Sequence, residues 1–325
     1  MGGNAAVRLQ SMTNTPTMDT NATVEQVIGL YLAGCEMVRI TARNLKEAAN
    51  LKNIRNKLEK EGYDIPIIAD VHFNPRVAEH AAGIVNKIRI NPGNYPDSRN
   101  SLKRLINICQ DHGTVIRVGV NHGSLSERIL NAYGNTAEGM VASAIEFLEI
   151  CRQYDFHDIV VSMKSSHVHT MIRATLDLVA EMQARAMDYP VHLGVTEAGE
   201  GEDGRVRSAA GIGPLLAMGI GDTIRVSLTE DPLAEIPVAE KIRDYHADIR
   251  KQLKEPIMLD PQKKPSQPSI FSFSYPDHDP EGLAIMASSD ISAHILNFPG
   301  NNYTIKGITG KEYPELVLNI LQATG

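Results

Sequence analysis

The chain has no tryptophan, only six phenylalanines among 325 residues, and no long apolar run. A core must therefore be built mainly from aliphatic side chains. A membrane-spanning helix needs roughly 18 consecutive apolar residues, and because no run approaches that length, no membrane segment is expected. The opening Met1-Gly2-Gly3-Asn4 has neither the basic start nor the apolar stretch of a signal peptide. These absences predict a cytoplasmic protein.

Cysteine is also scarce. Cys35, Cys109 and Cys151 are widely spaced, and no Cys-x-x-Cys pair occurs anywhere in the sequence. An odd number of distant cysteines suits buried, reduced thiols better than a disulfide framework or a metal site. We therefore do not expect the cysteines to carry the function.

Four arginines share one local pattern on this otherwise acidic chain, whose net charge of −7 argues against general affinity for nucleic acid. Each stands between aliphatic residues and is followed two places later by a small or polar residue. The four segments are Val38-Arg39-Ile40-Thr41, Ile88-Arg89-Ile90-Asn91, Ile116-Arg117-Val118-Gly119 and Ile224-Arg225-Val226-Ser227. In a buried strand, alternate residues share a face, and a charge buried there needs an anionic partner. Four converging arginines would suit a diphosphate.

Apolar, β-branched runs alternate with helix-like periodicity over most of the chain. The expected strands are 6–13, 37–41, 65–72, 86–91, 114–120, 158–164, 190–196 and 222–228. Eight strands, each followed by a helix, predict an α/β fold of the (β/α)8 TIM-barrel type. An open doubly wound sheet is the rival, but its glycine-rich fingerprint is missing after the first strand, where the chain reads Gln10-Ser11-Met12-Thr13-Asn14.

The amino-acid composition changes after residue 254. Residues 255–280 contain six prolines and are expected to form a linker. A helix, a strand and a helix are expected around Ala284–Ile295, Tyr303–Ile308 and Glu315–Leu321. Because such a short segment buries little core of its own, residues 281–325 either pack on the barrel of residues 1–254 or form part of a second, incomplete domain.

Active groups of a closed barrel lie at the carboxyl ends of its strands. Those positions hold Ser11, Thr13, Arg39, Asp70, His72, Arg89, Asn91, Arg117, Asn121, Ser162, Lys164, Thr196, Glu197, Arg225 and Ser227. So many cations at one mouth would repel each other without an anionic ligand. Asp70 and His72 share a strand face, but the paired histidines that a metal-dependent barrel places on its first strand are missing, so no metal site is expected.

Two glycine-containing segments near the C-terminal end of the barrel have less specific patterns. Residues 197–204 read as an acidic loop, in which Glu197 abuts the strand and could act as an acid or a base, whereas Glu200 to Asp203 suit a mobile loop. The segment Ala209-Ala210-Gly211-Ile212-Gly213-Pro214 has glycine spacing that can hold phosphate, but inside a helix it would instead allow close packing on the barrel. Packing is the favoured interpretation.

At the strand ends the chain closely resembles hydroxymethylbutenyl diphosphate synthase, in its three-domain form. The resemblance covers about residues 5–250 and keeps the order of the family's motifs. The matching stretches include Leu9-Gln10-Ser11-Met12-Thr13-Asn14-Thr15, Ile68-Ala69-Asp70-Val71-His72-Phe73-Asn74, Lys87-Ile88-Arg89-Ile90-Asn91-Pro92-Gly93-Asn94, Val161-Ser162-Met163-Lys164-Ser165-Ser166, Leu193-Gly194-Val195-Thr196-Glu197-Ala198-Gly199 and Gly221-Asp222-Thr223-Ile224-Arg225-Val226-Ser227-Leu228.

The resemblance implies an oxidoreductase of the methylerythritol phosphate route to isoprenoids. Such an enzyme reductively opens 2-C-methyl-D-erythritol 2,4-cyclodiphosphate to 4-hydroxy-3-methylbut-2-enyl diphosphate. The diphosphate would be held by Arg39, Arg89, Arg117, Lys164, Arg225 and Ser227. Asn91, Asn121, Asp70 and Glu197 would face the erythritol part, with Glu197 and Asp70 as the catalytic carboxylates.

The family's reduction uses a [4Fe–4S] cluster held by three cysteines and a glutamate on a separate domain, with ferredoxin or flavodoxin as electron donor. The missing Cys-x-x-Cys pair implies that the cluster domain is absent from this chain and that the chain alone does not turn over. Residues 281–325 then resemble the start of the inserted middle domain of three-domain members. The resemblance allows a homodimer, in which one subunit caps another, as well as capping within one chain.

Two other interpretations remain open at this point. A pterin-binding barrel of the dihydropteroate synthase type also holds a diphosphate at its strand ends, although with fewer arginines and with an Asn-rich first loop that is not seen here. The other interpretation is a non-catalytic barrel that binds a phosphorylated metabolite.

Overall fold

We describe the chain from a computed structural model. The described residues are 2–3, 5–71, 74–95, 99–252, 270–276, 279–297 and 301–324. Among them, no helix combines the length and the apolar character required to cross a bilayer.

Eight parallel strands form the central sheet of this described part. They are β1 (Arg8–Met12), β2 (Met37–Ala42), β3 (Ile67–Val71), β4 (Lys87–Ile90), β5 (Val115–Asn121), β6 (Ile159–Lys164), β7 (His192–Leu193) and β8 (Thr223–Ile224). Their order in the sheet is β6-β5-β4-β3-β2-β1-β8-β7. A parallel bridge between Val161 and Val191 joins β6 to β7, and the Val161 amide donates to the Pro190 carbonyl at 2.9 Å. The sheet is thus closed, which confirms the barrel and excludes the open doubly wound sheet.

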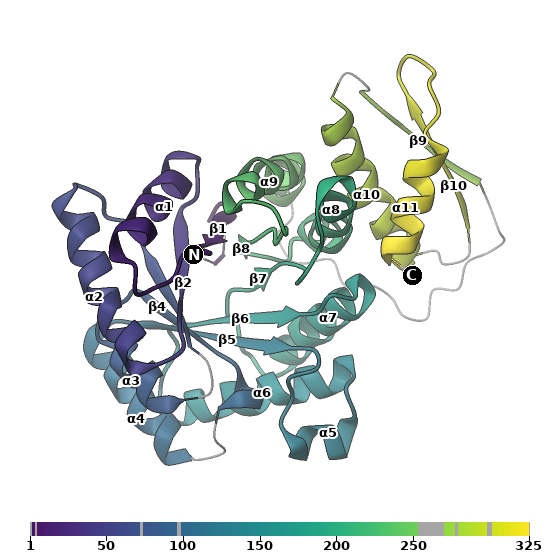
Figure 1. Cartoon of the computed structure of the whole chain (residues 1–325). Coiled ribbons are helices and arrows are strands. Elements are labelled where there is room, and N and C mark those ends of the chain that lie inside the picture. The colour runs from purple at the N-terminus through teal and green to yellow at the C-terminus, as the bar shows by residue number, and fades with distance from the viewer. Residues whose placement is uncertain are drawn as a thin grey trace.

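Helices follow the strands and surround the barrel (Figure 1). They are α1 (Thr20–Leu32), α2 (Leu45–Lys60), α3 (Pro75–Ala82), α4 (Arg99–His112), α5 (Glu127–Tyr133), α6 (Ala137–Gln153), α7 (Val168–Ala184), α8 (Gly201–Ala217) and α9 (Glu235–Gln252), with short 3-10 turns η1 (Pro92–Asn94) and η2 (Pro232–Ala234). Polar side chains cap several of them; Asn44, for example, accepts hydrogen bonds from the Lys46 and Glu47 amides at the start of α2. All eight expected strands are present, although β7 and β8 are shorter than expected because only two residues of each keep regular pairing.

The barrel wall separates an aliphatic layer from a polar interior. Strand residues such as Val38, Ile40, Ile88 and Val118 are buried in the main hydrophobic core. Their neighbours alternate to the other face, where Arg39, Arg89 and Arg117 lie. The core between strands and helices therefore supplies the hydrophobic stabilisation, and the interior is left for charged groups.

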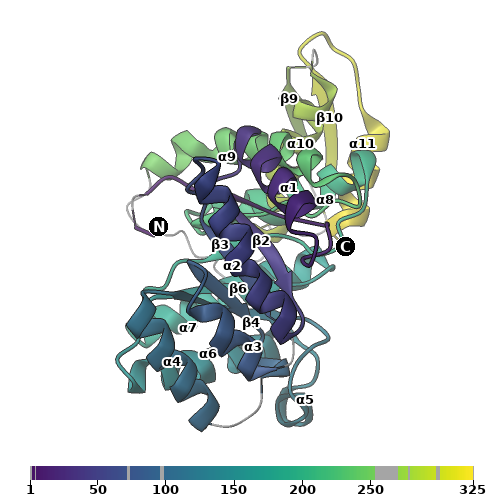
Figure 2. The ribbon, with the colours of Figure 1, turned by 60° about the vertical axis from the view of Figure 1, so that its left-hand side comes forward.

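The C-terminal unit lies to one side of the barrel, beside α8, in both views (Figures 1 and 2). It consists of β9 (Ile270–Tyr275), α10 (Pro280–Asn297), β10 (Asn302–Gly307) and α11 (Pro314–Thr324). The two strands pair in parallel, and their buried side chains form a second hydrophobic cluster with α10 and α11. Val206 of α8 belongs to this cluster, so the unit packs on the barrel. The helix, strand and helix expected from the sequence are present.

Two expectations need correction. Residues 270–275 were expected within the linker, but they form β9: Phe271, Phe273 and Tyr275 alternate with polar residues, a strand pattern that the surrounding prolines obscured. The remainder of the expected linker up to residue 269 lies outside the described residues. The expected acidic loop ends sooner than predicted, because α8 begins at Gly201, and Glu202 and Asp203 occupy its first turn, where negative charge is favourable.

The small residues of α8 allow α10 to approach closely. The segment Ala209–Pro214 lies inside α8, as expected, but it packs against α10 as well as against the barrel. A Cβ on Gly211 would meet Val195 and Met171 of the barrel, and a Cβ on Gly213 would lie 2.2 Å from Ser289 Oγ of α10. Ser292 Oγ donates to the Ala210 carbonyl at 2.7 Å. Packing, not phosphate binding, therefore accounts for these glycines.

We predict that Gly213→Ala destabilises the chain by at least about 1 kcal/mol, because the methyl group would push α10 away from α8. Gly29→Ala is the matched control. Gly29 is also helical, and its nearest new neighbour would be Leu233 at 3.9 Å, so the same substitution should stabilise that helix slightly. Urea unfolding measures both effects. Equal behaviour of the two variants would contradict the close contact.

Candidate functional site

The candidate site is the polar interior at the carboxyl ends of the barrel strands. Six cationic side chains point into it from four of the strands and from the start of the β8–α9 loop. They are Arg39 on β2, Lys87 and Arg89 on β4, Arg117 on β5, Lys164 on β6 and Arg225 just after β8. Arg117 is 1% exposed, and each of its main electrostatic neighbours other than Asp70 is another cation. The four arginines that share the local sequence pattern thus converge in the interior of one barrel.

Asp70 bridges two of these arginines. Its Oδ1 lies 3.3 Å from Arg89 Nη1 and its Oδ2 lies 3.5 Å from Arg39 Nε. The register places Asp70 directly beside Arg89 on neighbouring strands. Arg89 also donates through Nη2 to the Gly119 carbonyl and to Asn121 Oδ1, both at 3.1 Å. Asp70 therefore orients the two guanidinium groups and compensates part of their charge, which is a structural contribution in addition to any chemistry.

Arg225 is held by a carboxylate that the sequence analysis did not identify. Glu235, the first residue of α9, accepts hydrogen bonds from Arg225 Nη2 at 2.9 Å and from Arg225 Nε at 3.3 Å. Ser11 Oγ donates to the same carboxylate at 2.8 Å. Glu235 is 2% exposed. This buried pair fixes the direction in which Arg225 faces the interior.

The charges of Arg117 and Lys164 are not balanced by a carboxylate among the described residues. Arg117 Nη1 donates to the neutral Gln10 Oε1 at 3.1 Å. Burial and repulsion from neighbouring arginines lower the pKa of both groups well below their usual values. Gly194 leaves the space for Lys164, because a Cβ there would lie 2.3 Å from the Lys164 Nζ. These two cations need an anion more than the paired arginines do.

Lys87 and His192 form the deeper level of the same interior. Lys87 precedes Arg89 by two places and shares its strand face. Burial, with repulsion from Arg117, lowers the pKa of Lys87 to about 7. His192 Nδ1 lies 2.7 Å from Thr223 Oγ1, and burial together with repulsion from Lys164 and Arg117 lowers the pKa of its ring well below the usual value. The imidazole is therefore neutral at physiological pH.

Several polar atoms in this interior are buried and have no hydrogen-bond partner in the described part of the chain. They are Gln10 Nε2, Arg89 Nε, Arg117 Nε, Ser162 Oγ and His192 Nε2. A buried polar group without a partner is unfavourable by about 1–3 kcal/mol. Such groups, clustered around excess positive charge, are chemically suited to an anion with several oxygen atoms.

The remaining predicted residues lie nearer the loops. Asn91 is buried, and it accepts from the Gly93 amide at 3.1 Å and donates to the Ser124 carbonyl at 3.3 Å, so it organises the loop after β4. Ser227 is half-buried, in the loop that carries Arg225. Glu197 is exposed and has φ of +53°, a left-handed conformation that non-glycine residues adopt rarely and often at functional sites. His72 lies outside the described residues.

Comparison with known proteins shows the family of the chain. The sequence model described as the GcpE TIM-barrel domain matches residues 1–240. The chain belongs to the GcpE family. It is 54% identical over 266 residues to the 4-hydroxy-3-methylbut-2-en-1-yl diphosphate synthase (flavodoxin) of Parabacteroides distasonis, covering 75% of this chain and 44% of that protein. The protein of the same name from Protochlamydia amoebophila is 49% identical over 263 residues, covering 74% of this chain and 40% of that relative.

The chain thus spans less than half the length of these GcpE relatives. Solved structures show the barrel fold alone. A Yersinia pestis dihydropteroate synthase complexed with a sulfonamide drug has a TM-score of 0.53 at 9% identity, covering 77% of this chain and 96% of that one. A Leptospira borgpetersenii N-acetylneuraminic acid synthetase has a TM-score of 0.50 at 15% identity, covering 80% and 89%. Such distant likeness does not support a pterin substrate.

The cysteines of this GcpE chain do not fit an iron–sulfur cluster. All three are buried free thiols in the hydrophobic core. Burial raises the pKa of Cys35 to about 11 and those of Cys109 and Cys151 to about 12, whereas a cluster requires thiolates. Among the described residues, no group of three or more His, Cys, Asp or Glu side chains could hold a metal ion. The three cysteines are therefore unsuited to hold the cluster.

Sequence reasoning missed three groups of this GcpE site: Lys87, His192 and Glu235. Lys87 could have been found, since it lies two places before Arg89 and strand alternation puts both on one face. Strand alternation could also have indicated His192 and Thr223, because Thr223 lies two places before Arg225 and His192 is paired with Thr223 on the neighbouring strand. Glu235 gave no local signal, because it belongs to a helix and meets Ser11 only through the fold.

We predict that Lys87→Met stabilises the folded chain at and below pH 7. The folded-state pKa of Lys87, about 7, lies below its unfolded value, so the unfolded state binds more protons between about pH 7 and 10 and the lysine is unfavourable to folding at lower pH. The gain should be on the order of a few kcal/mol below pH 7 and should shrink steadily as the pH rises toward 10.

Urea unfolding at a series of pH values measures this gain. Lys46→Met on the exposed surface of α2 is the control, for which no such pH-dependent gain is expected. A gain at Lys87 that does not vary with pH would mean that packing alone, and not charge burial, is responsible.

Proposed function

We propose that the barrel binds 2-C-methyl-D-erythritol 2,4-cyclodiphosphate as the substrate-binding part of an enzyme that reductively opens this ring to 4-hydroxy-3-methylbut-2-enyl diphosphate. The observation that carries the proposal is the buried excess of cations, in which repulsion from neighbouring arginines outweighs the attraction of Asp70 for Arg117, and Lys164 faces only further cations among its main electrostatic neighbours in the described residues. A diphosphate supplies several oxygens and at least two negative charges. Membership of the GcpE family and the names of the relatives support this substrate.

In this proposal the residues fall into three roles. Arg89, Arg117 and Lys164 bind the diphosphate in the buried part of the interior. Three residues complete the set nearer the mouth: Arg39, Arg225 and Ser227. Asp70 and Glu235 orient Arg39, Arg89 and Arg225 before the substrate arrives, so little reorganisation is needed on binding. Asn91 and Asn121 face the erythritol part.

Glu197 is the carboxylate placed for proton transfer. It lies in the loop after β7, four residues beyond Leu193, and has a left-handed backbone conformation there. Ring opening followed by loss of water requires a proton donor, and an exposed carboxylate can be reprotonated from solvent. The [4Fe–4S] cluster of the family, for which this chain supplies no fitting ligands, is assigned to another part of the enzyme, as are contacts with flavodoxin or ferredoxin and any dimer interface.

We predict that the chain binds the cyclodiphosphate and that Arg117→Gln weakens the affinity by at least about tenfold, the loss expected for one charge-assisted contact. The control is Arg173→Gln on the outer face of α7, where Arg173 pairs with Asp177 on the surface; this variant should bind normally. Isothermal titration calorimetry at low and high salt measures the effect, and the affinity should fall as salt rises.

Titration with a pterin diphosphate in parallel separates the competing interpretations. The proposal is overturned if the folded chain does not bind the cyclodiphosphate, or if the pterin compound binds more tightly. Equal affinity of Arg117→Gln and the unmodified chain would place the ligand outside the barrel interior.

We predict that Glu197→Gln leaves the binding of the cyclodiphosphate within about twofold, because the carboxylate adds no attraction for an anion, and that the same substitution in the complete enzyme removes most of the turnover. Calorimetry on this chain tests the first part, and the rate of product formation tests the second. Full turnover by the variant would exclude Glu197 as the proton donor.

A further inference from the structure

Two loops at the mouth of the barrel are joined along their backbones. The β7–α8 loop carries Glu197, and the β8–α9 loop carries Arg225 and Ser227. The Ala198 amide donates to the Ser227 carbonyl at 3.2 Å, and the Thr229 amide donates to the Gly199 carbonyl at 3.0 Å. The position of Glu197 relative to Arg225 therefore depends on this junction.

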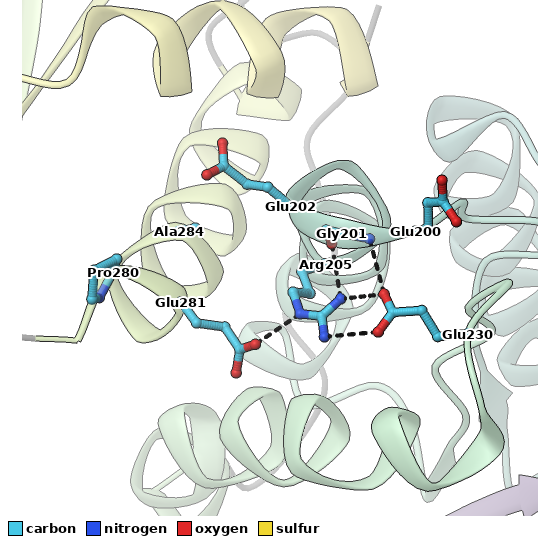
Figure 3. Close-up of a pocket in the computed structure, with 8 residues that line it drawn as sticks. All are labelled: Glu200, Gly201, Glu202, Arg205, Glu230, Pro280, Glu281 and Ala284. Atoms are coloured by element: carbon cyan, nitrogen blue, oxygen red, sulfur yellow. Dashed lines mark hydrogen bonds and ion pairs between the residues drawn. The ribbon is translucent and has the colours of Figure 1, made fainter.

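Arg205 closes the junction at its outer end (Figure 3). Its Nη1 donates to Glu230 Oε1 at 2.6 Å and to the Gly201 carbonyl at 2.9 Å, and its Nη2 donates to Glu230 Oε2 at 3.2 Å. The Gly201 amide donates to Glu230 Oε1 at 2.9 Å. Gly201, where the Glu197 loop enters α8, is thus tied to Glu230 of the other loop directly through its amide and indirectly through its carbonyl, which accepts from Arg205.

The same guanidinium also contacts the C-terminal unit, through its Nε atom. Arg205 Nε donates to Glu281 Oε2 at 2.7 Å, in the first turn of α10. Glu281 Oε1 and Asp279 Oδ2 each lie 3.0 Å from Lys241 Nζ on α9. One planar group therefore joins two barrel loops to α10. Its hydrogen bonds to Glu230 and Glu281 raise the pKa of Arg205 above its usual value despite partial burial.

The surroundings make this arginine difficult to replace. A cavity of about 530 Å³ lies here, and carboxylates dominate its lining: Glu200, Glu202, Glu230 and Glu281. Without Arg205, Glu230 and Glu281 would face each other with no cation between them, and like charges at short range repel. A lysine in its place carries the charge but has no planar fork with which to reach three acceptors at once.

We propose that Arg205 is a positioning residue, which holds the loop of Glu197 against the loop of Arg225 and Ser227 and makes this arrangement depend on the docking of α10 through Glu281. The roles of Glu197 and Arg225 rest on the proposed function, whereas the mechanical connection does not. The C-terminal unit would then act on the mouth of the barrel without contributing a residue to it.

Hydrogen–deuterium exchange of the unliganded 325-residue chain tests the connection. Arg205→Gln should speed the exchange of the Ala198 and Gly201 amides at least about tenfold, because their acceptors lie in the junction, while the barrel strands keep their protection. Arg205→Lys should give a smaller increase, and Glu281→Gln a smaller increase at the same amides. Arg173→Gln, which removes an ion pair on the outer face of α7, is the control and should change none of them.

A double variant distinguishes positioning from general stabilisation. If Glu281 acts on the loop through Arg205, adding Glu281→Gln to Arg205→Gln should produce no further increase in exchange at Ala198 and Gly201. The proposal is overturned if Arg205→Gln loosens only α10 and leaves the loop amides protected, or if it raises exchange equally throughout the barrel.

Calorimetry then relates the junction to the ligand. Arg205→Gln should weaken the binding of the cyclodiphosphate several-fold, although Arg205 itself does not line the cationic interior, since Ser227 and Arg225 would be held less firmly. If the unmodified chain does not bind this ligand, the proposed function fails, yet the exchange data still decide the role of Arg205. If the chain binds and Arg205→Gln binds equally well despite faster exchange, the junction does not position the binding groups and the inference fails.

Discussion

Repulsion among cations buried in one barrel is the constraint to which the rest of the site is fitted. The aliphatic core between strands and helices provides the stability that allows Arg117 to be 1% exposed in such surroundings. Two buried carboxylates, Asp70 and Glu235, compensate part of the charge and thereby leave Arg39, Arg89 and Arg225 in fixed orientations. The uncompensated remainder, at Arg117 and Lys164, is the part that an anionic ligand can relieve. An anion bound there would therefore stabilise the folded barrel through the same charges that it contacts.

Strand alternation accounts for most of what the sequence revealed. In a strand that packs against helices on one face and carries charges on the other, apolar and charged residues alternate with a period of two. That alternation identified the four arginines and the face on which they lie: Arg39, Arg89, Arg117 and Arg225. Applied one step further along β4, the same period would have identified Lys87. The eight strands followed from their β-branched residues for the same reason, and only β7 and β8 were overestimated in length.

Other parts of the site could not be predicted from local pattern. Glu235 is an acidic residue at the start of a helix, a place where such residues are common because of the helix dipole, so nothing marked it as the partner of Arg225 and Ser11. Strand β9 was obscured by nearby prolines, and the helical start at Gly201 was obscured by glycine and acid-rich composition. For Glu235 the tertiary environment decides the outcome, whereas for β9 the alternation of Phe271, Phe273 and Tyr275 was a local signal that the prolines concealed. The roles of Asn91 and Asn121 could be assigned to a loop and to Arg89 only once their partners were known.

The interior of the barrel and the outer rim of its mouth carry opposite charges. The interior is cationic, whereas the outer rim around Arg205 carries Glu200, Glu202, Glu230 and Glu281, in keeping with a net charge of −7. An acidic rim opposes the approach of a diphosphate, and it does so less when its carboxylates are engaged in ion pairs. Arg205 engages Glu230 and Glu281, and Lys241 engages Glu281. The Arg205–Glu230 pair requires the two mouth loops to be joined, and the other two pairs require α10 to be docked. Glu281 belongs to the C-terminal unit itself and pairs with both Arg205 and Lys241. Docking of this unit therefore adds a carboxylate that is already engaged in ion pairs, and its effect on the mouth acts through the position of the loops and not through the net charge of the rim.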